Sequence, residues 1–250
     1  MVSGRVIMIT GASSGIGAAA ARLFAAEGAS VVLMARREEA LRNVAREITE
    51  AGGIAVCAPG DVVRSVDVRQ AVQTAMTAFG RLDCAFNNAG WGTVGHPLHE
   101  VDDEIYDQIM DVNLRGVWNC MRAQLPPMLE TGVGAIVNTA SVAGVRATRA
   151  SAPYIAAKHA VIGLTRAAAA DYGQLGIRVN ALVVGSTRTE LLDHAIEVSP
   201  GGQAAPAGLS AQQRMASPDE IAQAAAWLCS GRSSFVTGTA LAVDGGRTAQ

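Results

Sequence analysis

The sequence carries little charge and no excess of either sign. Of its 250 residues, 17% are charged, and 20 Lys and Arg against 22 Asp and Glu leave a formal net charge of −2. Proteins that bind nucleic acid use clustered Lys and Arg for many phosphate contacts, and the sequence contains no such cluster. This composition excludes nucleic acid as the expected partner.

Long hydrophobic runs are missing, although 50% of the residues are hydrophobic. The longest uninterrupted runs, such as 224–229, span about six residues, whereas a bilayer helix needs about 20. The N-terminus shows no apolar segment followed by a cleavage site, so we expect a cytoplasmic protein without a membrane partner. No CxxC pair occurs among the cysteines, which indicates free thiols in a reducing compartment; they are Cys57, Cys84, Cys120 and Cys229.

Short apolar runs alternate with segments of helical periodicity along the whole chain. Runs that are apolar throughout suit strands covered on both faces, and their alternation with helices predicts repeated βαβ units. We therefore expect a single domain over residues 1–250, an α/β fold with a doubly wound, parallel sheet and helices on both faces. The expected strands are 6–9, 31–34, 54–57, 82–86, 135–138, 179–184 and 240–243.

One long stretch has no strand pattern. Residues 186–216 are rich in Gly and Pro, and a loop of that length inside a compact domain is usually functional. We expect a substrate lid at about 186–216. A disordered surface insertion is the alternative.

A glycine turn follows the first expected strand and opens the first helix. Gly11, Gly15 and Gly17 let the backbone approach a pyrophosphate, and the positive end of the helix attracts its charge. The position inside a βαβ unit supports a dinucleotide site. The other residues of the turn expected to contact the cofactor are Ser13, Ser14 and Ile16.

The end of the second strand bears on the choice of dinucleotide. An acidic residue at this point binds the ribose of NAD, but here the strand ends in Ala35, Arg36 and Arg37. A guanidinium can bind a 2′-phosphate with two hydrogen bonds, so we expect NADP(H) to be preferred, with Arg36 as its ligand and NAD as the alternative. Asp61 and Val62 follow the third strand, where Asp61 is suited to accept a hydrogen bond from adenine.

Tyr154 and Lys158 are four residues apart in a helical segment and project from one face. An ammonium beside a phenol is expected to lower the phenol pKa, which makes the tyrosine a usable acid and base. Ser141 follows another strand, at the end where open α/β sheets place ligands. Asn113 is a candidate fourth member of this set.

Five motifs together resemble the short-chain dehydrogenase/reductase family in its single-domain form. They are the glycine turn, the segment Asn87-Asn88-Ala89-Gly90, Asn113, Ser141, and Tyr154 with Lys158, and the serine precedes the tyrosine by 13 residues. The resemblance covers nearly the whole chain. It implies a Rossmann-like sheet of about seven parallel strands and hydride transfer between a nicotinamide and an alcohol or carbonyl.

The resemblance also implies roles for individual residues. Tyr154 would exchange a proton with the substrate oxygen, and Ser141 would hold that oxygen. Lys158 would lower the tyrosine pKa and bind the nicotinamide ribose, and Asn113 would bend its helix around a water that passes protons to Lys158. The remaining cofactor contacts that it implies are Asn88, Ala89, Gly90, Gly185, Thr187 and Thr189.

One position departs from the family pattern. Val184 stands where the family usually has proline, which leaves the following turn less rigid on sequence grounds. The closing segment 243–246 resembles the one that commonly packs across a two-fold axis in the family's tetramers, so we expect a homotetramer. His96 and His99 lack a third ligand nearby, and no metal site is expected.

These expectations combine into an NADP(H)-preferring oxidoreductase that interconverts a secondary alcohol and a ketone, with Tyr154 as general acid and base. Two alternatives stay open: an NAD-dependent diol or hydroxysteroid dehydrogenase, and a non-catalytic nucleotide-sensing Rossmann protein. Neither the substrate nor the physiological direction follows from the sequence.

Overall fold

The computed structural model describes residues 1–93, 97–190, 192 and 210–249. Seven parallel strands form one sheet in the order β3-β2-β1-β4-β5-β6-β7. The predicted Rossmann-like fold of about seven parallel strands is confirmed. The strands are β1 Val6–Thr10, β2 Ser30–Ala35, β3 Ile54–Pro59, β4 Cys84–Asn87, β5 Gly134–Thr139, β6 Ile177–Val184 and β7 Ala240–Val243.

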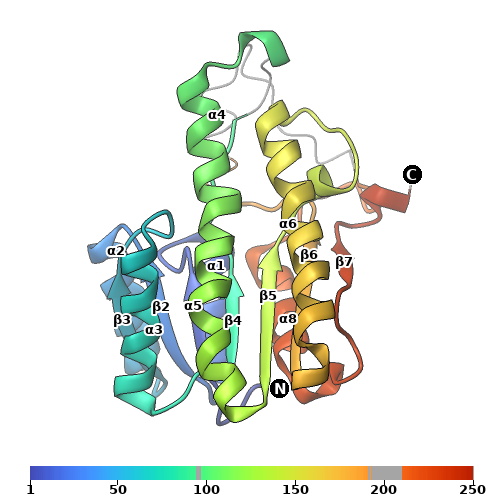
Figure 1. Ribbon diagram of the computed structural model, residues 1–250. Helices are drawn as coiled ribbons and strands as arrows, with labels where there is room; N and C mark the ends of the chain where they lie inside the picture. Colours follow the sequence, from blue (N-terminus) through green and yellow to red (C-terminus); the bar gives the residue numbers. More distant parts are fainter. Residues whose placement is uncertain (94–96, 191, 193–209, 250) are drawn as a thin grey trace.

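Helices cover both faces of the sheet, which explains why its central strands are apolar throughout. On one face, a hydrophobic core joins the sheet to α1 (Gly15–Ala26), α2 (Glu38–Glu50) and α8 (Pro218–Cys229). On the other, a second core joins it to α3 (Ser65–Phe79), α5 (Gly116–Thr131) and α6 (Ala152–Tyr172), which lie in front in Figure 1. The inner strands therefore bury side chains on both sides, and the edge strands β3 and β7 are only partly buried.

Helix α4 (Asp103–Met110) extends above the sheet and runs into α5 through the π-helical turn η2 (Asp111–Arg115), as Figure 1 shows. The spacing of Ser217 and Glu220 predicts a capping box, and the two residues form one at the start of α8. Short 3₁₀ turns complete the described structure: η1 Leu98–Glu100, η3 Val142–Gly144, η4 Gly173–Leu175, η6 Gly231–Ser233 and η7 Arg247–Ala249.

The sheet order creates a crevice above β1 and β4. After β1 the chain winds outward through β2 and β3, then crosses back to β4 on the other side of β1. At such a reversal the loops after neighbouring strands separate, and open α/β sheets bind ligands there. The glycine turn after β1 and the Asn88–Gly90 segment after β4 face each other across this point.

Val184 continues β6 to its last residue. It pairs with Val243 of β7, and the amide of Gly185 donates to the Val243 carbonyl at 3.0 Å. A proline at position 184 would fix φ and remove a donor, whereas valine continues the strand. The neighbouring strand therefore supports the backbone through Gly185, and the turn that was expected to be less rigid begins after it.

A buried cluster of amide side chains ties β4, β5, α5 and α6 together. The Asn87 amide donates to Gln124 at 3.1 Å and to Asn138 at 2.9 Å. Asn138 in turn donates to the Thr165 hydroxyl at 3.0 Å, and Thr165 donates to the Val161 carbonyl at 2.8 Å. All four polar side chains are at most 1% exposed, so every lost partner leaves a buried polar group unsatisfied.

We predict that Asn138→Leu destabilises the fold by about 2 to 3 kcal/mol, because Asn87 and Thr165 lose buried partners while the side-chain volume is nearly kept. Urea unfolding followed by far-UV circular dichroism measures this. Asn43, exposed on α2, is the control, and Asn43→Leu is expected to change the free energy of unfolding by less than about 0.5 kcal/mol. Equal effects of the two substitutions would contradict the account of the cluster.

Candidate active site

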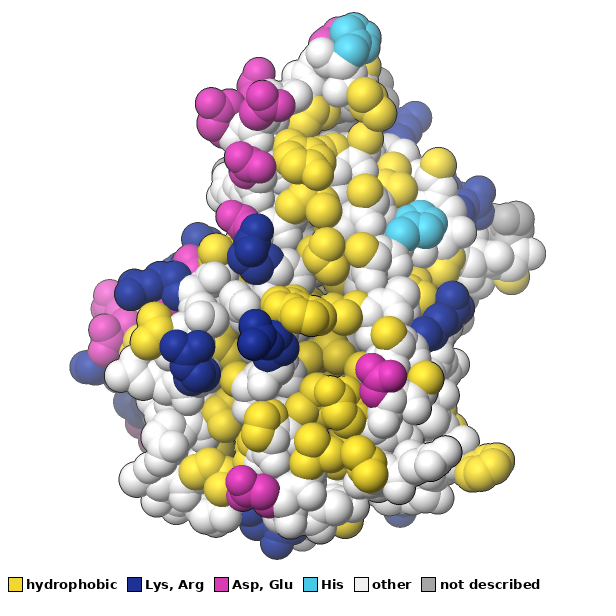
Figure 2. All heavy atoms as spheres, in the orientation of Figure 1, with side chains coloured by type: hydrophobic (Ala, Val, Ile, Leu, Met, Phe, Trp, Pro, Cys, Tyr) yellow, Lys and Arg dark blue, Asp and Glu magenta, His cyan; other side chains and the backbone are white. Residues whose placement is uncertain are grey.

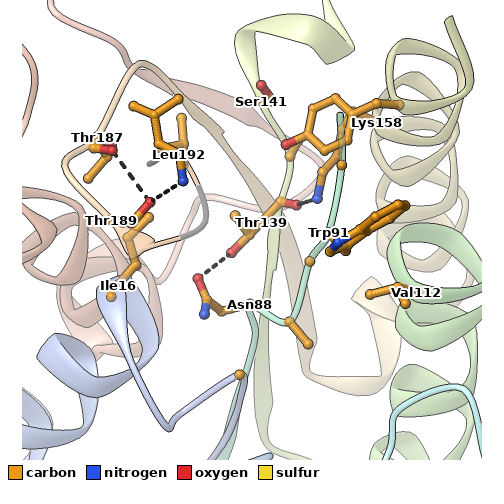
Figure 3. Close-up of a pocket in the computed structure, with 18 of the residues that line it drawn as sticks. Ile16, Asn88, Trp91, Val112, Thr139, Ser141, Lys158, Thr187, Thr189 and Leu192 are labelled. Atoms are coloured by element: carbon orange, nitrogen blue, oxygen red, sulfur yellow. Dashed lines mark hydrogen bonds between the residues drawn. The ribbon is translucent and has the colours of Figure 1, made fainter. Parts of the chain in front are cut away.

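A cleft of about 910 Å³ lies over the carboxyl ends of β1, β4, β5 and β6. The glycine turn and the end of β2 line one part of it, and Ser141, Tyr154 and Lys158 line another. Figure 3 shows Ile16 and Thr189 on one side, with Ser141, Thr139 and Lys158 across the cavity. The fold thus brings the two main sequence motifs, more than 120 residues apart in the chain, into one site.

The glycine turn is as tight as its residues predict. Gly11 has φ +66°, and a Cβ at this residue would lie 2.9 Å from the Cα of Ala89. A Cβ on Gly17 would lie only 2.2 Å from the Gly11 carbonyl oxygen. Ser14, the N-cap of α1, makes no side-chain cap hydrogen bond. The first amides of α1 consequently face the cleft with their partial positive charge available to an anion.

Thr10, the first residue of the glycine motif, has a positioning role that the sequence did not assign. Its hydroxyl oxygen accepts the backbone amides of Asn88 at 3.0 Å and Ala89 at 3.1 Å. The Asn88 amide group donates back to the Thr10 carbonyl at 3.3 Å. These bonds hold the segment after β4 against the glycine turn, where both Asn88 and Ala89 line the cleft. The sequence signal for this role is that Thr10 is a polar residue in the last position of an otherwise apolar strand.

Arg36 and Arg37 both line the cleft at the end of β2, but they differ in their contacts. The Arg37 guanidinium donates to the hydroxyls of Ser14 at 2.5 Å and Ser13 at 3.4 Å. Arg36 has no side-chain hydrogen bond or ion pair with any residue that the structure describes. The side chain that reaches the glycine turn is therefore Arg37, which follows the residue that we predicted as the phosphate ligand.

Asp61 and Val62 line the cleft beside these arginines. One carboxylate oxygen of Asp61 accepts the Val63 amide at 3.0 Å. The Asn119 amide group, on α5, donates to the carbonyls of Val62 and Val63, each at 3.0 Å. The loop after β3 is thus held in place from the neighbouring helix layer.

Ser141 and Tyr154 meet at the other part of the cleft. Ser141 follows β5 and accepts the Ala143 amide at 3.1 Å, and its side chain is close enough to the Tyr154 phenol to affect the phenol pKa. Gly92 packs on the phenol, since a Cβ there would lie 2.5 Å from a ring carbon of Tyr154. The phenolic oxygen is held at the carboxyl end of the sheet, facing the cavity.

Lys158 lies one turn further along α6 and is 2% exposed. Its Nζ donates to the Thr139 carbonyl at 2.8 Å and lies 5.5 Å from the centroid of the Tyr154 ring. Burial lowers the pKa of Lys158 to about 8. Because this remains above 7, the ammonium is the main form at neutral pH.

The expected lowering of the Tyr154 pKa is wrong in its net direction. Burial raises the pKa of the phenol above its ordinary value, and the hydrogen bond to Ser141 offsets only part of that rise. The ammonium is directed at the Thr139 carbonyl, and burial of the phenol dominates. The phenol consequently keeps its proton at neutral pH.

Asn113 lies in the π-helical turn between α4 and α5 and is completely buried. Its amide group donates to the carbonyls of Trp91 at 2.5 Å and Ile109 at 2.8 Å, and its oxygen accepts the Trp91 amide at 3.3 Å. A Cβ on Gly90 would lie 3.2 Å from Asn113 Oδ1 and 3.8 Å from Lys158 Nζ. Asn113 and Lys158 thus both lie close to the point that a side chain at Gly90 would occupy.

The segment after β6 covers the glycine turn. A methyl carbon of Thr189 lies 3.2 Å from the Cβ position of Gly15. Thr187 donates to the Gly185 carbonyl at 3.1 Å. Gly185, Thr187 and Thr189 all line the cleft. Thr187 also pairs with Ala216, so the two ends of the expected lid meet at its base. Residue 191 and residues 193–209 of that lid lie outside the described residues.

No group of three His, Cys, Asp or Glu side chains suited to a metal ion occurs among the described residues. His96 lies outside the described residues. Within the same part of the chain, none of the helices combines the length and hydropathy that a membrane span needs.

Comparison with known proteins agrees with this geometry. The family model described as enoyl-(acyl carrier protein) reductase matches residues 11–248. A curated relative, the A-factor type gamma-butyrolactone 1′-reductase (1S-forming) of Streptomyces virginiae, is 50% identical over 99% of this chain and 97% of its own. The 2,5-dichloro-2,5-cyclohexadiene-1,4-diol dehydrogenase of Sphingobium indicum is 46% identical over 99% of this chain and 98% of its own.

A solved structure is similar to this chain over its whole fold. The 3-ketoacyl-(acyl-carrier-protein) reductase of Brucella melitensis, crystallised with NADH, superposes with a TM-score of 0.91 at 36% identity, over 99% of this chain and 100% of that one. Family model, relatives and fold agree over nearly the whole length. The chain therefore belongs to the short-chain dehydrogenase/reductase family of NAD(P)-dependent oxidoreductases that act on CH–OH groups.

Proposed function

We propose that the protein is an NADP(H)-preferring oxidoreductase that interconverts a secondary alcohol and a ketone, with Tyr154 as general acid and base. The observation that carries the proposal is that Tyr154 and Ser141 line the same cleft as the glycine turn. A proton donor and a dinucleotide cradle in one cavity are what this chemistry requires.

The cleft suits a dinucleotide because its glycine turn is tight and presents main-chain amides. A Cβ on Gly11 would clash with Ala89 and one on Gly17 with the Gly11 carbonyl, and the uncapped start of α1 presents amides to a pyrophosphate. Asn88, Ala89 and Gly90 would lie along the adenosine side, and Gly185, Thr187 and Thr189 along the nicotinamide side. When bound, the nicotinamide supplies or accepts the hydride.

In reduction, Tyr154 gives its phenolic proton to the carbonyl oxygen as that oxygen becomes negative. The raised pKa of Tyr154 supports this direction, because the phenol carries its proton at neutral pH. Ser141 Oγ already accepts the Ala143 amide, so its own O–H is available to donate to the substrate oxygen. In oxidation the same groups act in reverse, and Tyr154 takes the proton of the alcohol.

Lys158 acts behind the tyrosine. Its ammonium stabilises the phenolate that forms after proton donation, and it would also bind the nicotinamide ribose. Asn113 holds the backbone at Trp91 and would place a water that returns protons to Lys158. The lack of a side chain at Gly90 supports this path, because a Cβ there would lie within 4 Å of both Asn113 Oδ1 and Lys158 Nζ.

The preference for NADP(H) is supported by the charges at the end of β2. β2 itself ends in Ala35 and not in an acidic residue, and Arg36 and Arg37 line the cleft with the hydroxyls of Ser13 and Ser14 close to Arg37. Asp61 would accept a hydrogen bond from the adenine amino group, with Val62 beside it. Arg36 and Arg37 together can bind a 2′-phosphate.

The substrate class that we propose is a cyclic ketone or secondary alcohol. The two curated relatives are named for a lactone and a cyclohexadiene diol. Trp91, Val142 and Leu192 give the cleft an apolar lining that suits a hydrocarbon ring. Residues 186–216 would act as the lid. The diol dehydrogenase name keeps NAD-dependent diol oxidation as the second candidate function.

We also propose a cytoplasmic homotetramer. Figure 2 shows hydrophobic side chains gathered over the face formed by α5 and α6. Tyr106 and Trp118, on α4 and α5, are each 47% exposed, and burial against another copy would remove this apolar area from water. The four cysteines are free, which suits a reducing compartment.

The general acid is tested by Tyr154→Phe. We predict a loss of about 10²- to 10⁴-fold in kcat/KM with cyclic ketones and NADPH, because the transferred proton is removed. Tyr172→Phe, about five turns further along α6, is the matched control and keeps full activity. If Tyr154→Phe is as active as the wild type, the mechanism is wrong. If the wild type binds dinucleotide but turns over no substrate of a broad panel, it is a nucleotide sensor instead.

Cofactor preference is tested by binding titrations with NADPH and NADH. We predict tighter binding of NADPH, and a loss of roughly 10-fold or more in NADPH affinity for Arg36→Ala with NADH affinity unchanged, since a charged hydrogen bond is removed. Arg42→Ala is the control, because Arg42 pairs with Glu38 on α2 and does not line the cleft. Preference for NADH with no effect of Arg36→Ala would favour the NAD-dependent alternative.

The assembly is tested by sedimentation velocity. We expect the wild type at micromolar concentration to sediment as a tetramer, and Trp118→Glu to give smaller species, because a buried carboxylate would lack a partner. Leu175→Glu, equally exposed but in the turn after α6, is the control. A monomeric wild type would contradict the proposal.

A further inference from the structure

Arg37 joins two walls of the cleft that are far apart in the sequence. While one end of its guanidinium donates to Ser13 and Ser14 of the glycine turn, its Nη1 pairs with the carboxylate of Glu190 at 2.9 Å. Glu190 belongs to the segment after β6 and lines the cleft. The guanidinium next to the expected phosphate ligand Arg36 thus already has an anionic partner from the protein itself.

The backbone keeps Glu190 near this position. Thr189, its neighbour, packs against Gly15 of the turn. The preceding residues are paired with Ala216, through the Arg188 amide to the Ala216 carbonyl at 3.1 Å and the Ala216 amide to the Ser186 carbonyl at 2.9 Å. Both ends of the ion pair are anchored by main chain, although the side chains are 55% and 65% exposed.

A carboxylate and a phosphate ester compete for the same guanidinium. Both are anions, both accept two parallel N–H bonds from Arg, and they repel each other at close range. The 2′-phosphate of NADP would need the edge of Arg37 that Glu190 occupies. NAD carries a neutral hydroxyl at that position, so its binding does not require Glu190 to leave.

We propose that Glu190 is a specificity-determining residue that reduces the preference for NADP(H) by competing with the 2′-phosphate for Arg37. The inference rests on the proposed function for the location of the adenosine ribose beside Arg36 and Arg37. The selectivity for NADP(H) over NAD(H) then depends on two opposing effects. Two arginines attract the 2′-phosphate, and the Glu190 carboxylate competes with it for Arg37.

The test measures dissociation constants for NADPH and NADH by fluorescence titration, without turnover. Glu190→Gln keeps the shape and removes the charge, and NADPH affinity is expected to rise about three- to tenfold, since exposed pairs and like charges each contribute modestly. NADH affinity is expected to change by less than about twofold. The ratio of the two affinities is the readout.

Glu38→Gln is the matched control for net charge. Glu38 is a similarly exposed acid that directly follows Arg37, but it pairs with Arg42. If Glu38→Gln raises NADPH affinity as much as Glu190→Gln does, the effect is long-range electrostatics and the proposal is wrong. An unchanged ratio of the NADPH and NADH dissociation constants in Glu190→Gln also overturns the proposal.

A double-mutant cycle with Arg37→Gln separates competition from other effects. In the Arg37→Gln background, Glu190→Gln is expected to leave NADPH affinity unchanged, because the shared cation is gone. If Glu190→Gln raises NADPH affinity as much in the Arg37→Gln background as in the wild type, the proposal is wrong. The proposed function fails on a different result, namely a wild type that prefers NADH or lacks ketone reduction, whereas the Glu190 inference depends on the change in ratio.

Discussion

The hydrogen bond between the Lys158 ammonium and the Thr139 carbonyl holds the catalytic end of the cleft together. It links α6 to the end of β5 at 2.8 Å and is made by a side chain that is 2% exposed. A buried ammonium needs such a partner, and burial lowers its pKa to about 8 even so. Because Tyr154 lies one helical turn before Lys158, the same bond places the phenol beside Ser141.

At the other end of the cleft, where the cofactor is expected, the main constraint is the close approach of backbone segments to the glycine turn. The glycine turn lies against Ala89 on one side and under Thr189 on the other, so β1, β4 and the segment after β6 converge on Gly11, Gly15 and Gly17. Thr10 adds the two hydrogen bonds that keep β4's extension in register with the turn. The cleft is therefore shaped mainly by main chain, which tolerates no side chain at these points.

Between these two ends, charge is arranged across the cleft. Arg37 is shared by the glycine turn and Glu190, while Arg36 beside it makes no polar side-chain contact with the described residues. Glu190, from the opposite wall, thus adds a negative charge at the end of β2. Under the proposal made above, the 2′-phosphate of NADP and this carboxylate compete for the Arg37 guanidinium.

The sequence by itself determined what depends on local spacing. Apolar runs predicted the strands to within about two residues at most ends, the capping box at Ser217 predicted the start of α8, and four-residue spacing put Tyr154 and Lys158 on one face of α6. The family motifs predicted which loops line the cleft. These features follow from the periods of helices and strands, which neighbouring residues fix.

Only the tertiary structure decided the order of the strands, the roles of Thr10 and Arg37, and the direction of the Tyr154 pKa. Burial of the phenol depends on how Gly92 packs against it, and the partner of Arg37 lies 153 residues away in the sequence. Desolvation and ion pairing depend on which distant segments meet, and no local pattern records that.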